Sequence, residues 1–317
     1  MKKYRIGVDI GGTTIKCGIV DEQGKILQKD LVKSEKNAEK DLENLTKLIN
    51  ILLGRQNIFI NDVLGVGVGC PGAVNSESGV IEILPNLKWE NFEIVKNLES
   101  KLNTKVLIDN DANVAALAEY RFGAAKGYKS AVTFTLGTGV GGAYIENGKL
   151  LEGKFGKGAE LGHATLVLDG IPCTCGRKGC IERYVSATAL IEQTKFAMQN
   201  DKHSKMWELA GCLENVDGKT AFDSAKLGDE TANKVVETYV KYLSESIMSM
   251  VNVFRPEVFV LGGGISLEGN YLTDKIKSYC EKYDYGYKNA PHPKVVCAKL
   301  GNDAGIIGAA SLICYIK

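Results

Sequence analysis

Residues 4–33 read YRIGVDIGGTTIKCGIVDEQGKILQKDLVK. Short runs rich in β-branched residues alternate here with glycine-containing turns at 11–14 and 22–25, a pattern that predicts three strands in a β-meander. A similar pattern returns at 130–153, where SAVTFTL, GTGVGG, AYIE, NGK and LLEG follow one another. Two hairpins bent around glycine turns favour an internally duplicated architecture, and a chance match is the alternative.

The rest of the chain alternates helical and strand patterns. Apolar residues at helical spacing predict helices over about 41–53 and 231–254, and an apolar closing helix over 304–316. VLGVGVG at 63–69 predicts a strand that ends at Cys-Pro-Gly, and VFVLGGG at 258–264 predicts a buried strand that ends in glycines. Strands and helices mixed in this way indicate an α/β protein.

Composition excludes several classes of protein. The 317 residues suggest about two domains, and 39 Lys and Arg against 38 Asp and Glu leave a formal net charge of +1. This balance provides no broad basic field for nucleic acid. No apolar run approaches the ~20 residues of a spanning helix, and the N-terminus lacks the long apolar region of a signal peptide. We therefore expect a cytoplasmic protein that binds neither nucleic acid nor membrane.

Glycine-rich turns follow three predicted strands, after Asp9, Leu136 and Leu261. A tight hairpin explains any one of them, but glycines also let backbone N–H groups approach phosphate oxygens. The first two turns precede strand patterns rather than helices, which excludes a Rossmann fingerprint or a Walker A loop. The turns instead predict a nucleotide gripped between two hairpins. The Asp9 carboxylate would hold Mg²⁺ through water, with turn capping as its alternative role.

Three of the nine cysteines cluster with a histidine: His163, Cys173, Cys175 and Cys180. Four such ligands in one short loop predict a closed, tetrahedral, structural zinc site. Redox chemistry is the alternative, but it favours Cys-x-x-Cys spacing near a βαβ unit. The other six cysteines are scattered singly, as expected for small buried side chains in a reducing compartment.

Asp109, Asn110 and Asp111 stand at the start of a predicted helix. Asn or Asp at this place caps unpaired N–H groups. Phosphoryl transfer to an alcohol needs a base for the hydroxyl proton, and the helix dipole keeps a carboxylate ionised for that role. From these residues alone, capping and base catalysis explain the triplet equally well.

Six segments together resemble the ROK family of bacterial sugar kinases and repressors: DIGGTTIKCGIVD, GVGCPGAV, DNDANVAALAE, TLGTGVGGA, GAELGHATLVLDGIPCTCGRKGCIE and VLGGGIS. They run in the expected order from Gly7 to Ala310. The closing LGNDAGIIGAA and the SATAL after the cysteines are most similar to the glucokinases of Gram-positive bacteria. The resemblance implies a two-domain actin-like ATPase fold, hexokinase-type and ribonuclease H-like, with an interdomain cleft that closes on sugar and ATP.

Domain limits and activity also follow from the resemblance. It implies a small N-terminal domain over 1–116, with a C-terminal helix at 304–317 packing back on it, and a larger domain over 117–303 with the zinc loop and nucleotide contacts. It implies ATP-dependent phosphorylation of a hexose at the 6-hydroxyl, with glucose favoured. N-acetylmannosamine, N-acetylglucosamine, allose and fructose are alternatives. Mg²⁺ and structural zinc are the expected ions, and a homodimer is the expected assembly.

Residue roles come from the same resemblance. Asp111 matches the catalytic base, and the N–H of a metal-fixed His163 would face the sugar. The implied sugar contacts are Gly72, Asn86, Asn110, Asp111, Glu160, His163 and Glu182. Read alone, Glu182 is a surface carboxylate before a helix. The implied nucleotide contacts are Asp9, Gly11, Gly12, Thr13, Thr14, Lys16, Gly137, Thr138, Gly139, Gly262, Gly263 and Gly264.

Two other classes compete with a kinase. A sugar-sensing repressor of this family carries a winged helix-turn-helix before the DIGGT strand, and only about three residues precede the first strand here. A filament-forming actin-like protein needs neither Asn110-Asp111 nor the cysteine cluster. A sugar kinase is therefore the favoured interpretation.

Overall fold

A computed structural model of the chain describes residues 3–285 and 290–315. The chain forms two compact units: unit 1 comprises residues 1–129, 143–159 and 299–317, and unit 2 comprises 130–142 and 160–298. The boundary expected at residues 116 and 117 falls inside helix α3 (Asp111–Phe122). The expected domain limits stay a prediction, and the outermost residues of the expected 1–116 domain and 304–317 helix lie outside the described residues.

Unit 1 is built on a sheet with strand order β3-β2-β1-β4-β8. β1 (Tyr4–Ile10), β2 (Thr14–Val20) and β3 (Ile26–Lys33) pair antiparallel in sequence, which confirms the predicted meander. β4 (Val63–Cys70) pairs parallel with β1, and β8 (Val106–Asn110) pairs parallel with β4. The carboxyl ends of β1, β4 and β8 therefore share one edge of the sheet.

Side-chain alternation gives this sheet two different faces. Ile6, Val8 and Ile10 are buried in one core cluster with apolar residues of α1 (Ala38–Arg55) and α2 (Ile94–Leu102). A small second sheet in unit 1 consists of β5 (Ala73–Asn75), β6 (Val80–Leu84) and β7 (Trp89–Phe92), and its buried residues join the same cluster.

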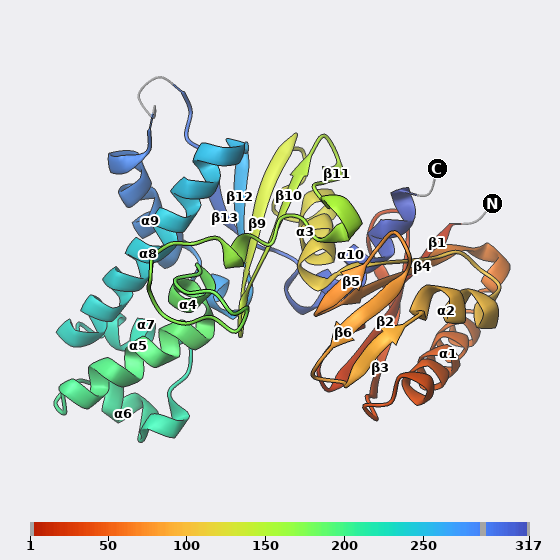
Figure 1. Ribbon diagram of the computed structural model, residues 1–317, viewed down its shortest axis with the longest axis horizontal. Coiled ribbons are helices and arrows are strands. Elements are labelled where there is room, and N and C mark those ends of the chain that lie inside the picture. The colour runs from red at the N-terminus through yellow and green to blue at the C-terminus, as the bar shows by residue number, and fades with distance from the viewer. Residues whose placement is uncertain (1–2, 286–289, 316–317) are drawn as a thin grey trace. The chain divides into compact units, whose positions relative to one another are not determined.

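Glycines on the other face let α10 (Ala304–Leu312) lie directly on the strands. A Cβ at Gly7 would stand 1.9 Å from the Ile306 carbonyl oxygen, and one at Gly67 would stand 1.7 Å from that of Ala309. Figure 1 shows this C-terminal helix beside the N-terminal strands of unit 1. Because no side chain larger than hydrogen fits between these backbones, the glycines set the depth at which α10 packs.

Unit 2 contains strands of a second sheet with the order β11-β10-β9-β12-β13. The strands of this sheet are β9 (Ser130–Leu136), β10 (Val140–Glu146), β11 (Lys149–Leu150), β12 (Val258–Gly262) and β13 (Lys294–Cys297). The division between the units cuts through β10 and leaves β11 in unit 1. β12 pairs parallel with both β9 and β13. The order matches that of unit 1 strand for strand, which supports the duplicated architecture.

Helices make up most of the remainder of unit 2. They are α4 (Glu182–Val185), α5 (Ala187–Asn200), α6 (Met206–Ala210), α7 (Thr220–Lys226), α8 (Glu230–Phe254) and α9 (Asn270–Tyr283). Short 3₁₀ helices in the chain cover Ile60–Asp62, Lys154–Gly156, Leu161–His163, Leu213–Asn215, Gly264–Glu268, Gly301–Asp303 and Ile313–Tyr315. Within the described residues, no helix combines the length and apolarity needed to cross a membrane.

Two expected boundaries differ from the structure. The glycine turn expected at 137–142 ends earlier, because β10 begins at Val140. Gly142 belongs to the strand, where a Cβ would stand 2.5 Å from the Leu161 side chain. The closing helix expected over 304–316 is α-helical only to Leu312 and continues as a 3₁₀ turn.

We expect Gly67→Ala to lower the free energy of unfolding by roughly 3 kcal/mol, because a Cβ at this site would push α10 away from β4. The matched control is Gly54→Ala in α1, where a Cβ would meet no atom within 4 Å. Removing a helical glycine there should be neutral or stabilise by up to about 1 kcal/mol. Urea unfolding followed by circular dichroism measures both, and equal stability of the two variants would contradict the packing argument.

Candidate functional site

The first glycine turn joins β1 to β2 and leaves backbone donors free. The Gly11 N–H donates to the Thr14 carbonyl at 2.8 Å, and the Thr13 carbonyl accepts from the Ser34 N–H at 3.0 Å. Among the described residues, the N–H groups of Gly12 and Thr13 make no hydrogen bond. Two adjacent free N–H groups in a tight turn are suited to binding an anion.

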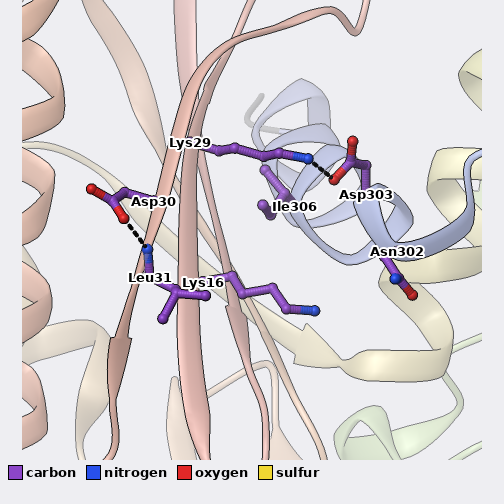
Figure 2. Close-up of a pocket in the computed structure, with 7 residues that line it drawn as sticks. All are labelled: Lys16, Lys29, Asp30, Leu31, Asn302, Asp303 and Ile306. Carbon is purple, nitrogen blue, oxygen red and sulfur yellow. Dashed lines mark hydrogen bonds and ion pairs between the residues drawn. The ribbon is translucent and has the colours of Figure 1, made fainter.

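Asp9 ends β1 beside this turn, and the Lys16 Nζ lies 3.5 Å from its Oδ2. Lys16 also lines a cavity of about 340 Å³ in unit 1 (Figure 2). The cavity is lined by Lys16, Lys29, Asp30, Leu31, Asn302, Asp303 and Ile306. Lys29 is held there by Asp303, with 2.5 Å between Nζ and Oδ1. The lysines and carboxylates of this cavity balance in number, so it presents no net charge.

The second glycine turn joins β9 to β10, and here too the carbonyl groups are hydrogen-bonded while two N–H groups are free. The Gly137 carbonyl accepts from the Ala187 N–H at 2.9 Å, and the Thr138 carbonyl accepts from the Thr188 hydroxyl at 2.8 Å. The Gly139 carbonyl accepts from the Gly137 N–H at 3.0 Å. In the part of the chain that the structure describes, the N–H groups of Thr138 and Gly139 remain free of hydrogen bonds.

The third turn, at residues 262–264, lies against the second. Gly262 pairs with Thr135 in the parallel ladder, and Gly263 has a φ of 81°. A Cβ at Gly263 would stand 2.3 Å from the Leu136 carbonyl oxygen. Both the backbone conformation and the close contact therefore require glycine, and unit 2 brings two of the three predicted nucleotide turns together.

Asp109, Asn110 and Asp111 span the junction from β8 to α3, and the structure separates their environments. Asn110 is the N-cap, and its Oδ1 accepts from the Ala112 N–H at 2.8 Å. Asp111 Oδ1 also accepts from that N–H at 2.8 Å, and its side chain is exposed. Asp109 is buried. Of the two carboxylates, only Asp111 is accessible to a substrate.

The buried Asp109 carboxylate braces this junction. Its Oδ1 accepts from the Asn110 N–H at 2.7 Å and from the Asn113 Nδ2 at 2.8 Å. Burial raises the pKa of Asp109 to about 6 despite these hydrogen bonds, which act in the opposite direction, and the negative charge of Glu152 adds to the increase.

Gly72 and Asn86 lie in unit 1 with the first turn. The φ of Gly72 is 87°, and a Cβ there would stand 2.4 Å from the Ile83 carbonyl oxygen. The Asn86 Nδ2 would lie 3.5 Å from a Cβ at Gly12, so the amide is next to the free N–H groups of the turn. Gly72 therefore allows the chain at the start of β5 to lie close to β6, and Asn86 lies beside the turn.

The four predicted metal ligands converge in unit 2. Their ligand atoms all lie within 4.8 Å of one another. His163 Nδ1 is 3.7 Å from Cys173 Sγ, and Cys175 Sγ is 3.6 Å from Cys180 Sγ. Zn–S and Zn–N bonds of about 2.3 and 2.0 Å in a tetrahedron separate ligand atoms by about 3.5–3.8 Å, so these donors fit zinc.

Backbone hydrogen bonds hold this loop in shape. The Cys173 N–H donates to the Arg177 carbonyl at 2.8 Å, and Gly179, with a φ of 73°, leaves no space for a Cβ against the Val167 carbonyl oxygen. A hydrogen bond from the Arg177 N–H lowers the pKa of the Cys175 thiol, whereas burial raises that of Cys180 to about 12.

The two glutamates near this loop differ in their surroundings. Glu160 is exposed, and its carbonyl accepts from the His163 N–H at 3.0 Å. Glu182 begins α4 and is half-buried; its Oε2 accepts from the Val140 N–H at 3.0 Å. The Glu182 side chain is thus not the plain surface carboxylate that the sequence alone favoured.

Each unit therefore gathers part of the predicted set. Unit 1 holds Asp9, Gly11, Gly12, Thr13, Thr14, Lys16, Gly72, Asn86, Asn110 and Asp111, and unit 2 holds Gly137, Thr138, Gly139, Glu160, His163, Glu182, Gly262, Gly263, Gly264 and the three cysteines. The sequence did not point to Thr188, whose hydroxyl holds the Thr138 carbonyl of the second turn. Thr188 lies in the SATAL segment, which resembles the family, but the resemblance assigned no role to this residue.

Several known proteins are similar to this chain over nearly its full length. Residues 5–315 match the model of the ROK family. The glucokinase of Thermotoga maritima is 36% identical over 314 residues, 97% of this chain and 96% of that protein. The glucokinase of Streptomyces coelicolor is 34% identical over 97% of this chain and 96% of its own length. A ROK family glucokinase from Streptomyces griseus, solved with glucose and AMPPNP, has a TM-score of 0.82 at 34% identity and covers 98% of both chains. The expected two-domain actin-like ATPase fold is confirmed.

We expect Asp109→Asn to change how stability depends on pH. Asparagine keeps an oxygen for the bonds from Asn110 and Asn113 but does not titrate. The pKa of Asp109, about 6 in the folded chain, lies above the ~3.9 of an unfolded aspartate, so the stabilisation from its proton is complete below pH ~4 and lost as the pH rises through about 6. The melting temperature of the variant should therefore rise relative to the parent by roughly 2–6 °C between pH ~4.5 and ~7.5.

Differential scanning calorimetry of both proteins at several pH values measures this shift. Titrating groups common to the two proteins cancel in the difference. A difference in melting temperature that stays constant over this range would show that the pKa of Asp109 is ordinary.

Proposed function

The chain belongs to the ROK family, and on that premise we propose that it is an ATP-dependent hexose kinase that phosphorylates the 6-hydroxyl, with glucose as the preferred sugar. The observation that carries this proposal is an exposed carboxylate, Asp111, at the start of α3 in a chain whose glycine turns keep free N–H groups. Relatives described as glucokinases over nearly their full length support glucose as the sugar.

ATP binds through the glycine turns. The free N–H groups of Gly12, Thr13, Thr138 and Gly139 are donors for its phosphate oxygens, and the third turn follows the adjacent strand β12. Asp9 carries the carboxylate that would hold Mg²⁺ at this edge of unit 1, and Lys16 beside it adds a positive charge. Bound Mg²⁺ supplies neutralisation of the phosphate charge during transfer.

Asp111 acts as the general base. As the sugar O6 attacks the γ-phosphorus, an O–P bond forms, the bond from the γ-phosphorus to the bridging oxygen breaks, and ADP leaves. The O6 proton passes to the Asp111 carboxylate, which the N-terminal end of the α3 dipole keeps ionised beforehand. The Asn110 side chain supports this role because it caps the helix by accepting from the Ala112 N–H, so capping does not depend on the Asp111 carboxylate alone.

The sugar hydroxyls are bound by carboxylates, amides and an imidazole. The proposed contacts are Gly72, Asn86, Asn110, Asp111, Glu160, His163 and Glu182. His163 turns Nδ1 toward the cysteines, and its Nε2 makes no hydrogen bond within the described residues, which leaves that nitrogen for a hydroxyl. Polar groups that pair with substrate hydroxyls discriminate against sugars that lack the matching hydroxyl.

Zinc is the proposed occupant of the Cys and His cluster. His163, Cys173, Cys175 and Cys180 would hold it, and the donor distances fit a tetrahedral ion. The bound ion would supply rigidity to this loop. A homodimer and a place in the cytoplasm remain predictions from the sequence.

The proposed function is tested by measuring ADP release with glucose, N-acetylmannosamine, N-acetylglucosamine, allose and fructose. We expect glucose to give the highest kcat/KM, and Asp111→Ala to lower kcat by ~10²–10⁴-fold or more because the base is missing. Asp274→Ala removes an exposed carboxylate from α9 and serves as the matched control with unchanged kcat.

Two outcomes count against the proposal. If no hexose or hexosamine stimulates ADP release above the background ATPase rate, the protein is not a sugar kinase. If Asp111→Ala keeps more than about a tenth of the parent turnover, the base is another group.

We expect the purified protein to contain about one zinc ion per chain, and Cys180→Ser to lose it together with several degrees of melting temperature. Cys212→Ser is the control, because Cys212 lies outside the cluster. Elemental analysis and thermal unfolding measure both effects. If zinc removal raises the KM for sugar, the ion also shapes the sugar site through His163; an unchanged KM would restrict it to stabilising the fold.

A further inference from the structure

Glu182 contacts two parts of unit 2 that the proposed function treats separately. Its Oε2 accepts the Val140 N–H at 3.0 Å, directly after the second glycine turn. Its Oε1 lies 3.7 Å from Cys173 Sγ, one of the proposed zinc ligands. A second ligand, Cys180, precedes it by two residues in the chain. One carboxylate therefore joins the metal loop to the nucleotide turn.

The Glu182 carboxylate lies so close to Gly139 that little room is left for a side chain there. A Cβ at Gly139 would stand 2.2 Å from Glu182 Oε2 and 3.1 Å from its Cδ. The backbone of Gly139 is not in the left-handed region, so conformation does not require glycine there. A side chain at this position would therefore have to displace the Glu182 carboxylate.

A second contact reaches the same peptide from the metal loop. Gly162 precedes His163 in the 3₁₀ helix Leu161–His163, and a Cβ at Gly162 would stand 2.0 Å from the Val140 carbonyl oxygen. The metal loop thus touches Val140 at its N–H through Glu182 and at its carbonyl through Gly162. Both ends of this residue are held from the metal side.

The remaining peptide groups of the turn are held by α5 and by the turn itself. Ala187 and Thr188 bind the carbonyls of Gly137 and Thr138, and the Gly139 carbonyl bonds within the turn. With these carbonyls engaged and the Val140 N–H on Glu182, the free donors among the described atoms of the turn are the N–H groups of Thr138 and Gly139. Glu182 holds the peptide group that joins Gly139 to Val140, directly after these two donors.

We propose that Glu182 is a positioning residue for ATP, which holds the second glycine turn against the metal loop so that the Thr138 and Gly139 N–H groups face the phosphates. This inference rests on the proposed function and adds a nucleotide role to a residue expected to contact only sugar. A carboxylate has about four acceptor sites, so the bond to Val140 leaves others for a sugar hydroxyl.

The test compares Glu182→Ala with Glu182→Gln, which retains an oxygen for the Val140 N–H. Affinity for AMPPNP with Mg²⁺ is measured by calorimetry without sugar. We expect about a 10-fold loss of affinity in the alanine variant, as for a lost charge-assisted hydrogen bond, and a loss within about threefold in the glutamine variant. Asp274→Ala is the control: it removes an exposed carboxylate from α9, elsewhere in unit 2, and should leave AMPPNP affinity unchanged.

Amide hydrogen exchange gives a readout that needs no nucleotide. Peptides covering residues 137–142 should exchange at least about 10-fold faster in Glu182→Ala than in the parent or in Glu182→Gln, because the Val140 N–H loses its acceptor. Zinc content and melting temperature identify any variant whose metal loop has unfolded. If Glu182→Ala is such a variant, Glu182→Gln is compared instead with Glu182→Leu, whose side chain is of similar size but accepts no hydrogen bond.

A double-mutant cycle isolates the contact itself. Gly139→Ala should weaken AMPPNP binding in the parent, because its Cβ strikes the Glu182 carboxylate, and should cost at least about threefold less in the Glu182→Ala background. Strict additivity of the two changes would overturn the proposed contact.

The results separate this inference from the proposed function. If the parent does not bind AMPPNP, the kinase function fails, and the exchange data still decide whether Glu182 holds the turn. If Glu182→Ala raises only the KM for hexose, with AMPPNP affinity and exchange at 137–142 unchanged, Glu182 is a sugar contact and the positioning role is wrong.

Discussion

The contact between α10 and the strands of unit 1 is the constraint on which the position of Asp111, at the start of α3, depends. At Gly7 and Gly67 the backbone of the helix approaches the backbones of β1 and β4 so closely that no Cβ fits. Gly308 makes the same kind of approach to α3, with 1.7 Å between a Cβ and the Val114 carbonyl oxygen. A helix from the C-terminus thereby sets the depth of α3, whose first residue is Asp111. The position of Asp111, the proposed base, is therefore set by contacts far from it in sequence.

A second physical rule governs the glycine turns. A peptide group offers one donor and one acceptor, and a turn binds an anion well only if its acceptors are engaged elsewhere. In the second turn α5 engages two carbonyls, and Glu182 accepts from the Val140 N–H directly after the turn. The negative charge of Glu182 is bound to a backbone N–H, which turns it into part of the scaffold. Neither partner could be assigned from the turn sequence alone.

The fold was predictable from local patterns to a large extent. The meander, the long helix α8 and the buried strand β12 all follow from period-2 or period-3.6 burial, which is a property of short segments. The end of the second turn was placed too late, because a strand that begins at Val140 and contains glycines does not have the usual strand composition. One of its glycines, Gly142, leaves room for the Leu161 side chain, a contact between segments apart in sequence.

By itself, the sequence determined the family, the paired glycine-turn hairpins and the cluster of one histidine and three cysteines, because each is a matter of residue type and spacing along the chain. It assigned the base to Asp111 rather than Asp109 only through the resemblance, and it treated Glu182 as a sugar contact or a surface charge. Only the tertiary structure decided these points: burial holds Asp109 inside while Asp111 is exposed, and Glu182 reaches a peptide 42 residues away in sequence. Exposure and long-range hydrogen bonds depend on how segments pack, and spacing along a chain does not encode them directly.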